Sequence, residues 1–285
     1  MSRARFIFFD MDGTLLDDEK NMDEAFLDYL KDLKKRKDVR FGISTGRHIA
    51  MVEPYIEKHG LQSYFDGLVY NGGADIYYFN SGEHIKNNYL SIQTLKLIQN
   101  TFQEQELFSI GFHNGLNLIV TRMDERFRNI RGKNIYNIIH YRDYPTFDEA
   151  PKLIIYFDST NLEPVKKALE ANPIHGMHWF VTEPNIIEMH NNKNTKAQGV
   201  EKYLARDGLT LEDIMVFGDA DNDRHIMVGA GVSVCMKNGN EQIKKIADYV
   251  TEYTNNDNGI MKFLMKHEHL LHDAVRPINI FERNG

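Results

Sequence analysis

The sequence predicts an α/β protein with a Rossmann-like parallel-sheet core and an inserted α+β cap domain. Two apolar runs, FIFF at residues 6–9 and IMVF at residues 214–217, each lead directly into carboxylates. Such runs are typical of buried parallel strands, and ligands bind at the carboxyl ends of strands in open α/β sheets. Between these runs the predicted elements change from alternating strands and helices to hairpins beside helices. We therefore expect a core made of residues 1–81 and 189–285, and a cap made of residues 82–188.

Composition sets the protein class. Of the 285 residues, 42% are hydrophobic and 26% are charged, as in ordinary globular proteins with a sizeable core. The formal net charge of -7 disfavours nonspecific binding to nucleic acid. No apolar run reaches the length of a membrane span, and carboxylates interrupt FIFF too early for a signal peptide. The single cysteine, Cys235, excludes an internal disulfide and fits a reducing cytosol. We expect a cytoplasmic monomer or small homo-oligomer without nucleic-acid or membrane partners.

The first strand carries the most informative motif, DMDGT. Asp10 ends the apolar run and Asp12 follows two residues later. Two carboxylates so close repel unless a cation or an exchangeable proton relieves them, which suggests a metal site, an acid/base site, or both. Gly13 permits a tight turn, and Thr14 offers its hydroxyl to that turn. An ordinary strand followed by an Asx-type turn is the alternative for this motif alone.

A helix and a second strand come next. Residues 21–37 have helical apolar spacing, with Asn21 and Glu24 placed as a capping pair. The strand at residues 39–44 then delivers a hydroxyl, a glycine and a cation in Thr45, Gly46 and Arg47. Hydroxyl and backbone N–H groups before a helix can donate to phosphate oxygens, although a plain helix cap would look the same. Arg47 either reaches a substrate or pairs locally.

The next segments lead into the expected cap. Asn71 follows a strand at residues 66–70 and is either a turn residue or a group facing the same ligand as Asp10. The cap is expected to contain a helix near residues 91–104, a hairpin over residues 107–121, and strands near residues 152–158, 178–182 and 185–189. Candidates for its contribution to a substrate are His113, Asn114 and Asp158. A long insertion of this kind commonly carries specificity or excludes water.

The returning core brings a lysine and a second acidic group. Lys196 falls in the first turn of a predicted helix, where a cation is electrostatically unfavourable. A nearby anion would explain it, whereas a solvated lysine is the commoner alternative. The sequence GDADND at residues 218–223 follows the strand IMVF and contains Asp219, Asn222 and Asp223. Clustered hard oxygen ligands suit Mg²⁺, whereas an acidic helix start is the alternative.

The ordered set DMDGT, STGR, Lys196 and GDADND resembles the haloacid dehalogenase-like hydrolases, specifically the Cof-like phosphatases with a large α/β cap. The resemblance covers about residues 6–263. It implies that Asp10 is a nucleophile that forms an aspartyl-phosphate and that Asp12 is the general acid and base. It also implies Mg²⁺ held by the carboxylates of Asp10 and Asp219 and the carbonyl of Asp12, with Asp223 supporting this site. Phosphoryl oxygens would be held by Thr45, Gly46, Lys196 and Asn222. One departure from the family pattern is Ala197, where glycine is usual, with Lys193 nearby as a rival for Lys196; the other is Asn258, where aspartate is common.

These residues suit phosphoryl transfer, because Mg²⁺ and a lysine offset the repulsion between a phosphate dianion and a carboxylate nucleophile. The expected function is Mg²⁺-dependent hydrolysis of small phosphorylated metabolites, with sugar phosphates as the leading substrate class. A phosphotransferase or phosphomutase that uses the same aspartyl-phosphate is the enzymatic alternative. A phosphometabolite sensor is the non-enzymatic one, but it predicts a broken catalytic set, whereas Asp10 and Asp12 are both present.

Overall fold

The protein is described by a computed structural model that covers residues 3–102, 106–114, 117–123, 137–143 and 148–273. The chain separates into two compact units. The first unit consists of Met1–Ile43, Gln62–Gly67 and Leu204–Gly285, and the second consists of Ser44–Leu61 and Leu68–Tyr203.

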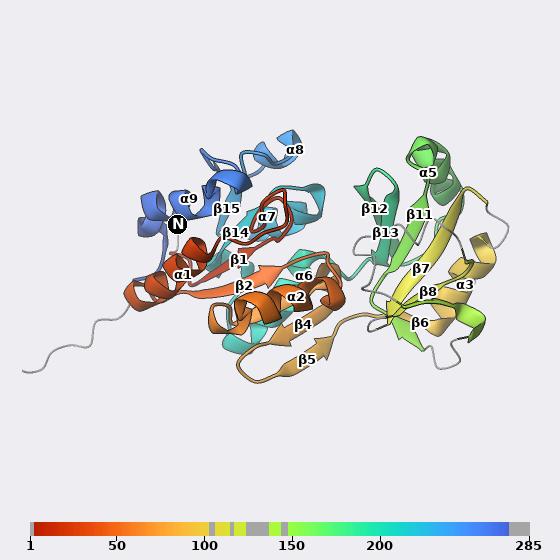
Figure 1. The fold of residues 1–285 in the computed structure, drawn as a ribbon, viewed down its shortest axis with the longest axis horizontal. Helices are drawn as coiled ribbons and strands as arrows, with labels where there is room; N and C mark the ends of the chain where they lie inside the picture. Colours follow the sequence, from red (N-terminus) through yellow and green to blue (C-terminus); the bar gives the residue numbers. More distant parts are fainter. Residues whose placement is uncertain (1–2, 103–105, 115–116, 124–136, 144–147, 274–285) are drawn as a thin grey trace, which may run out of the picture. The chain divides into compact units, whose positions relative to one another are not determined.

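Parallel strands form the sheet of the first unit (Figure 1). Their order is β16 (Tyr249–Val250), β15 (Val232–Cys235), β14 (Ile214–Gly218), β1 (Phe6–Phe9) and β2 (Arg40–Ser44). Its helices are α1 (Glu24–Arg36), α7 (Arg224–Gly229), α8 (Glu241–Lys244) and α9 (Gly259–His267). The predicted parallel α/β core is therefore confirmed.

Strand β1 is an interior strand of this sheet, flanked by β14 and β2. Phe6 pairs with Ile214 on one side and with Arg40 on the other. All four side chains of β1 are fully buried, and the ring of Phe9 stacks on that of Phe217 with centroids 5.5 Å apart. Burial on both faces explains why the strand is apolar at every position instead of alternating.

Helix α1 begins later than the sequence predicts. Its N-cap is Asp23, whose carboxylate accepts a hydrogen bond of 2.8 Å from the backbone N–H of Ala25. Asn21 instead belongs to the preceding turn, where its backbone N–H donates to the carboxylate of Asp17 at 2.7 Å. The predicted capping pair of Asn21 and Glu24 is therefore wrong, because Asp23 is closer to the free N–H groups of the first turn.

The second unit contains an α+β arrangement. A six-stranded sheet has the order β12 (Met177–Glu183), β13 (Ile186–Asn191), β11 (Leu153–Phe157), β7 (Phe108–Asn114), β8 (Asn117–Val120) and β9 (Asn137–His140), and every pair except β8 with β9 is antiparallel. The hairpin predicted over residues 107–121 is confirmed by β7 and β8, although residues 115–116 lie outside the described residues. The remaining elements are α2 (Ile49–His59), β3 (Gly67–Tyr70), β4 (Asp75–Tyr78), β5 (Glu83–Lys86), β6 (Leu90–Ser91), α3 (Ile92–Phe102), β10 (Glu149–Ala150), α5 (Leu162–Ala171) and α6 (Lys196–Leu204).

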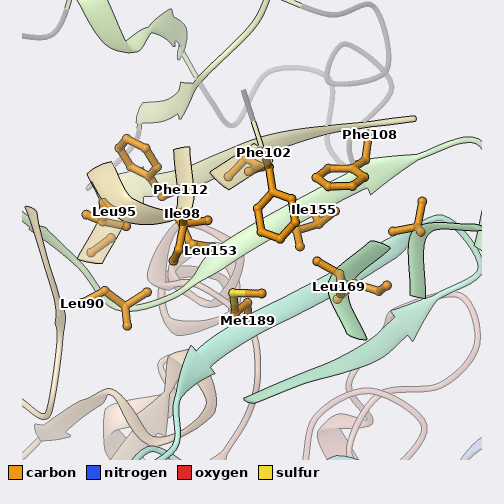
Figure 2. Close-up of a cluster of buried hydrophobic side chains, with 14 of the residues drawn as sticks. Leu90, Leu95, Ile98, Phe102, Phe108, Phe112, Leu153, Ile155, Leu169 and Met189 are labelled. Atoms are coloured by element: carbon orange, nitrogen blue, oxygen red, sulfur yellow. The ribbon is translucent and has the colours of Figure 1, made fainter. Parts of the chain in front are cut away.

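One hydrophobic core holds the six-stranded sheet against α3 and α5. Figure 2 shows side chains of Phe102, Phe108, Ile155, Leu169 and Met189 meeting between these elements. The helix predicted near residues 91–104 is present as α3 up to Phe102, and residues 103–105 lie outside the described residues. This packing gives the strands of the second unit a fixed support for the side chains on their other face.

Candidate active site

Two parallel strands of the first unit end in the carboxylates that the sequence singles out. Asp10 follows β1 directly, is buried, and donates its backbone N–H to the carbonyl of Phe217 at 3.0 Å. Asp219 follows β14, the neighbour of β1. One ligand oxygen from each of Asp10, Asp219 and Asp223 lies within 4.8 Å of the others. These three residues are called the carboxylate cluster below.

The DGT turn supports Asp219. The hydroxyl of Thr14 donates to Asp219 Oδ1 at 3.0 Å. Gly13 has φ +73°, and a Cβ placed on it would lie 2.6 Å from Asp219 Oδ2. Only glycine therefore allows the turn to approach this carboxylate without strain. The sequence suggested that Thr14 bonds within its own turn, whereas its hydroxyl orients a carboxylate from a strand more than 200 residues away in the sequence.

The carboxylate of Asp223 binds the backbone N–H groups at Asp219 and Ala220. Its Oδ2 accepts hydrogen bonds from the backbone N–H of Asp219 at 3.0 Å and of Ala220 at 3.2 Å. A Cβ at Gly218 would lie 2.5 Å from the same oxygen, so glycine makes room for this contact. Within the short 3₁₀ turn Asp221–Asp223, the neighbouring Asn222 has a buried Oδ1 without a hydrogen-bond partner among the described residues.

The carboxylate cluster fits a divalent cation. Three carboxylates held this close repel one another unless a cation neutralises them. Two oxygens bound to one Mg²⁺ at about 2.1 Å lie at most about 4.2 Å apart, so a spread of 4.8 Å requires only small side-chain adjustments. All three donors are hard oxygens, which favours Mg²⁺ over softer metals. Within the part of the chain that the structure describes, this is the group of acidic, histidine or cysteine ligands close enough for an ion.

Asp12 lies beside the cluster in sequence but its carboxylate has another neighbour. Lys20 Nζ donates to Asp12 Oδ1 at 2.8 Å, and both side chains are partly exposed. Lys20 has φ +65°, a left-handed conformation unusual for a side chain of its size. The carboxylate of Asp12 is therefore in reach of solvent, a condition for the proton transfer expected of it.

The predicted phosphate-binding loop belongs to the second unit. Thr45 is buried, and its backbone N–H donates to the carbonyl of Val69 at 2.9 Å. Its carbonyl accepts from the backbone N–H of Gly72 at 3.1 Å, and its Oγ1 accepts from the N–H of Arg47 at 3.1 Å. The loop is thus held from the NGG turn at residues 71–73, which follows β3. The following helix α2 starts at Ile49 with His48 as its N-cap, two residues later than predicted.

Lys196 opens α6 and is buried, with 2% of its surface exposed, whereas its sequence rival Lys193 is exposed. The helix start is capped by Thr195, whose hydroxyl accepts from the N–H of Gln198 at 3.2 Å. This helix packs directly on the NGG turn, because a Cβ at Gly73 would lie 2.1 Å from the carbonyl oxygen of Thr195. Because backbone atoms contact backbone atoms here, the start of α6, and with it the backbone of Lys196, has little freedom to move relative to the turn.

This close contact gives a stability prediction. Gly73→Ala should lower the free energy of unfolding by roughly 2 kcal/mol or more, because a methyl group at position 73 meets backbone atoms. Its melting temperature should therefore fall far more than that of Gly176→Ala. Gly176 is the matched control, since it also has positive φ (+79°) but a Cβ placed there would have no heavy atom within 4 Å. Thermal unfolding followed by circular dichroism checks this. Equal losses in the two variants would show that only the backbone conformation matters at Gly73.

The two substrate-contact candidates differ in their surroundings. Arg47 donates from its guanidinium to the carbonyl of Met51 at 3.2 Å and lies over the ring of Tyr55. Asn71 is buried, has φ +51°, and donates its side-chain amide to Asp75 Oδ2 at 2.7 Å. Asn71 begins the NGG turn, which agrees with the turn role. It also lines a cavity, so a ligand-facing role is compatible with the same geometry.

This cavity of about 310 Å³ lies within the second unit and is lined mainly by polar side chains. Asp75 is fully buried and accepts hydrogen bonds from Tyr89 OH at 2.6 Å and from Asn71. The rings of His48 and His113 stack with centroids 4.6 Å apart. Burial lowers the pKa of His48 to about 4 and holds the pKa of His113 well below its usual range. Both imidazoles are neutral near pH 7, so each offers one donor and one acceptor nitrogen.

The cap candidates do not all reach this cavity. His113 and Asn114 line it, as do His84, Lys86 and Glu149. Asp158 does not line it and is an exposed residue before the turn Ser159–Asn161.

Several residues of this region could not be singled out from the sequence. Lys152 donates to the carbonyl of Gly46 at 2.6 Å and pairs with Glu188, and Asp75 organises one wall of the cavity. A usable signal was present in the strand IIEMHN, where Glu188 and His190 interrupt an apolar run on the same face. Charged groups at such positions are rarely buried unless they are paired.

None of the helices among the described residues is long and apolar enough to cross a membrane.

Comparisons with known proteins point to one family. The model of the haloacid dehalogenase-like hydrolase family matches residues 7–264. The Mycoplasma genitalium protein MG265, provisionally named as a phosphatase, is 29% identical over 280 residues, which cover 91% of this chain and 97% of that protein. The Bacillus subtilis 5-amino-6-(5-phospho-D-ribitylamino)uracil phosphatase YitU is 25% identical, covering 93% of this chain and 98% of its own length.

A solved structure shares the fold. The HAD subclass IIB sugar phosphatase BT4131 superimposes with a TM-score of 0.78 at 22% identity, over 94% of this chain and 100% of that chain.

Proposed function

Because this chain belongs to the haloacid dehalogenase-like hydrolase family, we propose that it is a Mg²⁺-dependent phosphatase of small phosphorylated metabolites, with sugar phosphates as the leading substrates. The class of enzyme, a phosphoric monoester hydrolase, follows from the family and from relatives named as phosphatases. The observation that carries the finer proposal is the carboxylate cluster at the ends of two adjacent parallel strands.

In the proposed reaction, a carboxylate oxygen of Asp10 attacks the phosphorus atom and forms a new O–P bond. The bond between phosphorus and the ester oxygen breaks, and Asp12 donates its proton to the leaving alcohol. Asp12 then takes a proton from a water molecule, which attacks the aspartyl-phosphate. Inorganic phosphate leaves and the Asp10 carboxylate is regenerated. These roles are supported by the family resemblance, by the position of Asp10 in the carboxylate cluster, and by the partial exposure of Asp12.

Charge on the phosphoryl group must be offset for Asp10 to approach. We assign the donors to the Thr45 hydroxyl, the Gly46 N–H, Lys196 and Asn222. The proposed Mg²⁺ would be held by the carboxylates of Asp10 and Asp219 and by the carbonyl of Asp12, and it would neutralise negative charge on the reacting group. Asp223 would act through the backbone of Asp219, to which it is hydrogen-bonded.

The organic part of the substrate is assigned to the cavity of the second unit. His48 and Ile49, which line it, follow the proposed phosphate-binding loop directly in sequence. Neutral imidazoles, amides and carboxylates provide both donors and acceptors for hydroxyl groups. The relative YitU acts, by its name, on a phosphorylated ribityl compound, and the structural neighbour BT4131 is named a sugar phosphatase. A hydroxyl-rich leaving group therefore fits best.

The remaining features belong to the same proposal. We keep residues 82–188 as the cap that closes over the substrate, inserted between core residues 1–81 and 189–285. Cytoplasmic location is proposed from the single cysteine, Cys235, which is buried and free in the structure. The partner is a small phosphorylated metabolite, and the protein is proposed to be a monomer or a small homo-oligomer.

Turnover by the purified full chain tests this function. We expect release of inorganic phosphate from p-nitrophenyl phosphate and, more efficiently, from one or more sugar or polyol phosphates. The activity should be lost with a chelator and restored by Mg²⁺. Adding an acceptor sugar distinguishes the phosphotransferase alternative, because a transferase yields a new phosphate ester instead of inorganic phosphate. Absence of turnover across a broad panel of phosphate esters would refute the enzyme and favour a sensor.

A further inference from the structure

Lys152 is a buried cation that the proposed chemistry does not use. Only 2% of its surface is exposed, and it precedes β11 in the second unit. Its ammonium donates to the carbonyl oxygen of Gly46 at 2.6 Å and to Glu188 Oε1 at 2.5 Å. A buried ion pair seldom adds net stability over apolar residues of similar size, because both charges lose their hydration. The contact with Gly46 therefore invites a functional explanation.

Sheet register brings the partners of Lys152 to one face. Leu153 of β11 pairs with Met189 of β13, so Lys152 lies on the same face of the sheet as Glu188 and His190. Glu188 Oε2 lies 3.1 Å from His190 Nε2, and His190 is fully buried. Burial would raise the pKa of Glu188, but the charge of Lys152 and the contact with His190 outweigh it and lower that pKa to about 2. Lys152, Glu188 and His190 are called the Lys152 network below.

The network contacts the proposed phosphate-binding loop directly through Lys152 and indirectly through His190, which packs on Gly72. Lys152 binds the carbonyl of the peptide that joins Gly46 to Arg47. The ring of His190 packs against Gly72, where a Cβ would lie 2.8 Å from His190 Cε1. Gly72 in turn donates its N–H to the carbonyl of the peptide that joins Thr45 to Gly46. Both successive peptide groups of the loop are thus held at their carbonyl oxygens.

Holding the carbonyl of a peptide also fixes its N–H. The peptide group is planar and trans, so its N–H points opposite to its carbonyl. In the peptide that joins Thr45 to Gly46, the bond from Gly72 therefore sets the direction of the Gly46 N–H, a proposed phosphate donor. In the peptide that joins Gly46 to Arg47, whose carbonyl is held by Lys152, the N–H of Arg47 donates to Thr45 Oγ1 at 3.1 Å. An oxygen that accepts this bond keeps its own proton for donation to another group. Gly46 lacks a side chain, so the loop is most easily rotated at this residue without such restraints.

We propose that Lys152 is a positioning residue for phosphoryl binding: by holding the Gly46 carbonyl it fixes the Arg47 N–H and, through the bond of that N–H to Thr45 Oγ1, orients the Thr45 hydroxyl toward the phosphoryl group. This inference rests on the proposed function of the loop. Lys152 acts through the loop and does not itself contact substrate, and its charge is matched by that of Glu188. Its effect is therefore geometric, unlike the electrostatic effect assigned to Lys196.

The test replaces the pair without leaving a buried charge. Lys152→Met alone leaves Glu188 buried without its cation and is expected to destabilise the fold. The double variant Lys152→Met with Glu188→Gln removes both charges and should keep a melting temperature close to that of the wild type. In this variant we expect kcat/KM for p-nitrophenyl phosphate to fall by about 10- to 100-fold, less than or comparable to the loss of one direct donor. The matched control is Lys166→Met with Glu163→Gln, an exposed pair on α5, which should leave activity unchanged.

Two further measurements separate positioning from a purely structural role. Inorganic phosphate binding, measured by calorimetry with Mg²⁺ present, should weaken by about the same factor, about 10- to 100-fold. In a Thr45→Val background, which lacks the hydroxyl, the double variant should have a much smaller additional effect. Wild-type phosphate affinity and kcat/KM in a stable double variant would overturn the proposal.

The binding measurement is independent of turnover. If the wild type hydrolyses no phosphate ester, the proposed function fails, yet weaker phosphate binding in the double variant would still support the role of Lys152. If the wild type is active and the losses in the Thr45→Val background are fully additive, the role of Lys152 fails while the proposed function stands.

Discussion

Asp10→Asn is expected to lower kcat for phosphate-ester hydrolysis by on the order of 10⁴-fold or more, because the neutral amide is a very poor nucleophile. The substitution preserves size, so the buried site after β1 should remain folded. Steady-state release of phosphate measures the loss. Acid quenching during turnover of labelled substrate should trap phosphorus on the wild-type protein but not on the variant.

The acidic turn provides a matched control for this experiment. Asp221→Asn makes the same chemical change in the same acidic stretch, but Asp221 is exposed and pairs with Arg224. It is absent from the carboxylate cluster. We expect activity within about twofold of the wild type, as for most surface substitutions. A phosphorylated intermediate in Asp10→Asn, or a comparable loss in Asp221→Asn, would contradict the assigned nucleophile.

Removing one ligand should change the metal requirement. Asp219→Asn is expected to raise the Mg²⁺ concentration for half-maximal activity by roughly 100-fold, since even residues that only support a ligand cost 10- to 100-fold in metal affinity. Mg²⁺ should stabilise the wild type against heat, by about 2.7 kcal/mol at 100 times its dissociation constant. The variant should show a much smaller rise in melting temperature at the same concentration.

The variant should also separate metal binding from fold stability. Without Mg²⁺, Asp219→Asn relieves repulsion among three carboxylates held within 4.8 Å, so its metal-free form should melt no lower than that of the wild type. The amide oxygen of the variant can still accept the hydrogen bond from the Thr14 hydroxyl, so this contact need not be lost. Asp221→Asn again serves as the control. Unchanged Mg²⁺ dependence in Asp219→Asn would argue against a metal at this cluster.

Local patterns were sufficient to predict the parallel core. FIFF and IMVF are apolar at every position, which is required of strands buried on both faces, and each ends at a carboxylate. Convergence of Asp10 and Asp219 then follows from parallel neighbours that share one edge. The catalytic and binding roles of these residues, and the domain boundaries, stay predictions.

Contacts that depend on the register between distant strands could not be predicted. Lys152 reaches Gly46 and Glu188 only because Leu153 pairs with Met189, and no local pattern encodes this pairing. The Thr14 hydroxyl was assigned to its own turn because its true acceptor, Asp219, lies far along the chain. At the start of α1, several polar residues compete for the capping role, and the turn at Asp17 decides between them.

The position of β1 between β2 and β14 also has a consequence for biosynthesis. Its neighbour β2 follows within about 35 residues, but its other neighbour, β14, begins only at Ile214. At about 5–20 residues per second, translation takes roughly 10–40 s to supply that strand. During this time one edge of a wholly apolar strand remains unpaired, which is a hazard for aggregation. We expect the nascent chain to depend on chaperone shielding until β14 has left the ribosome.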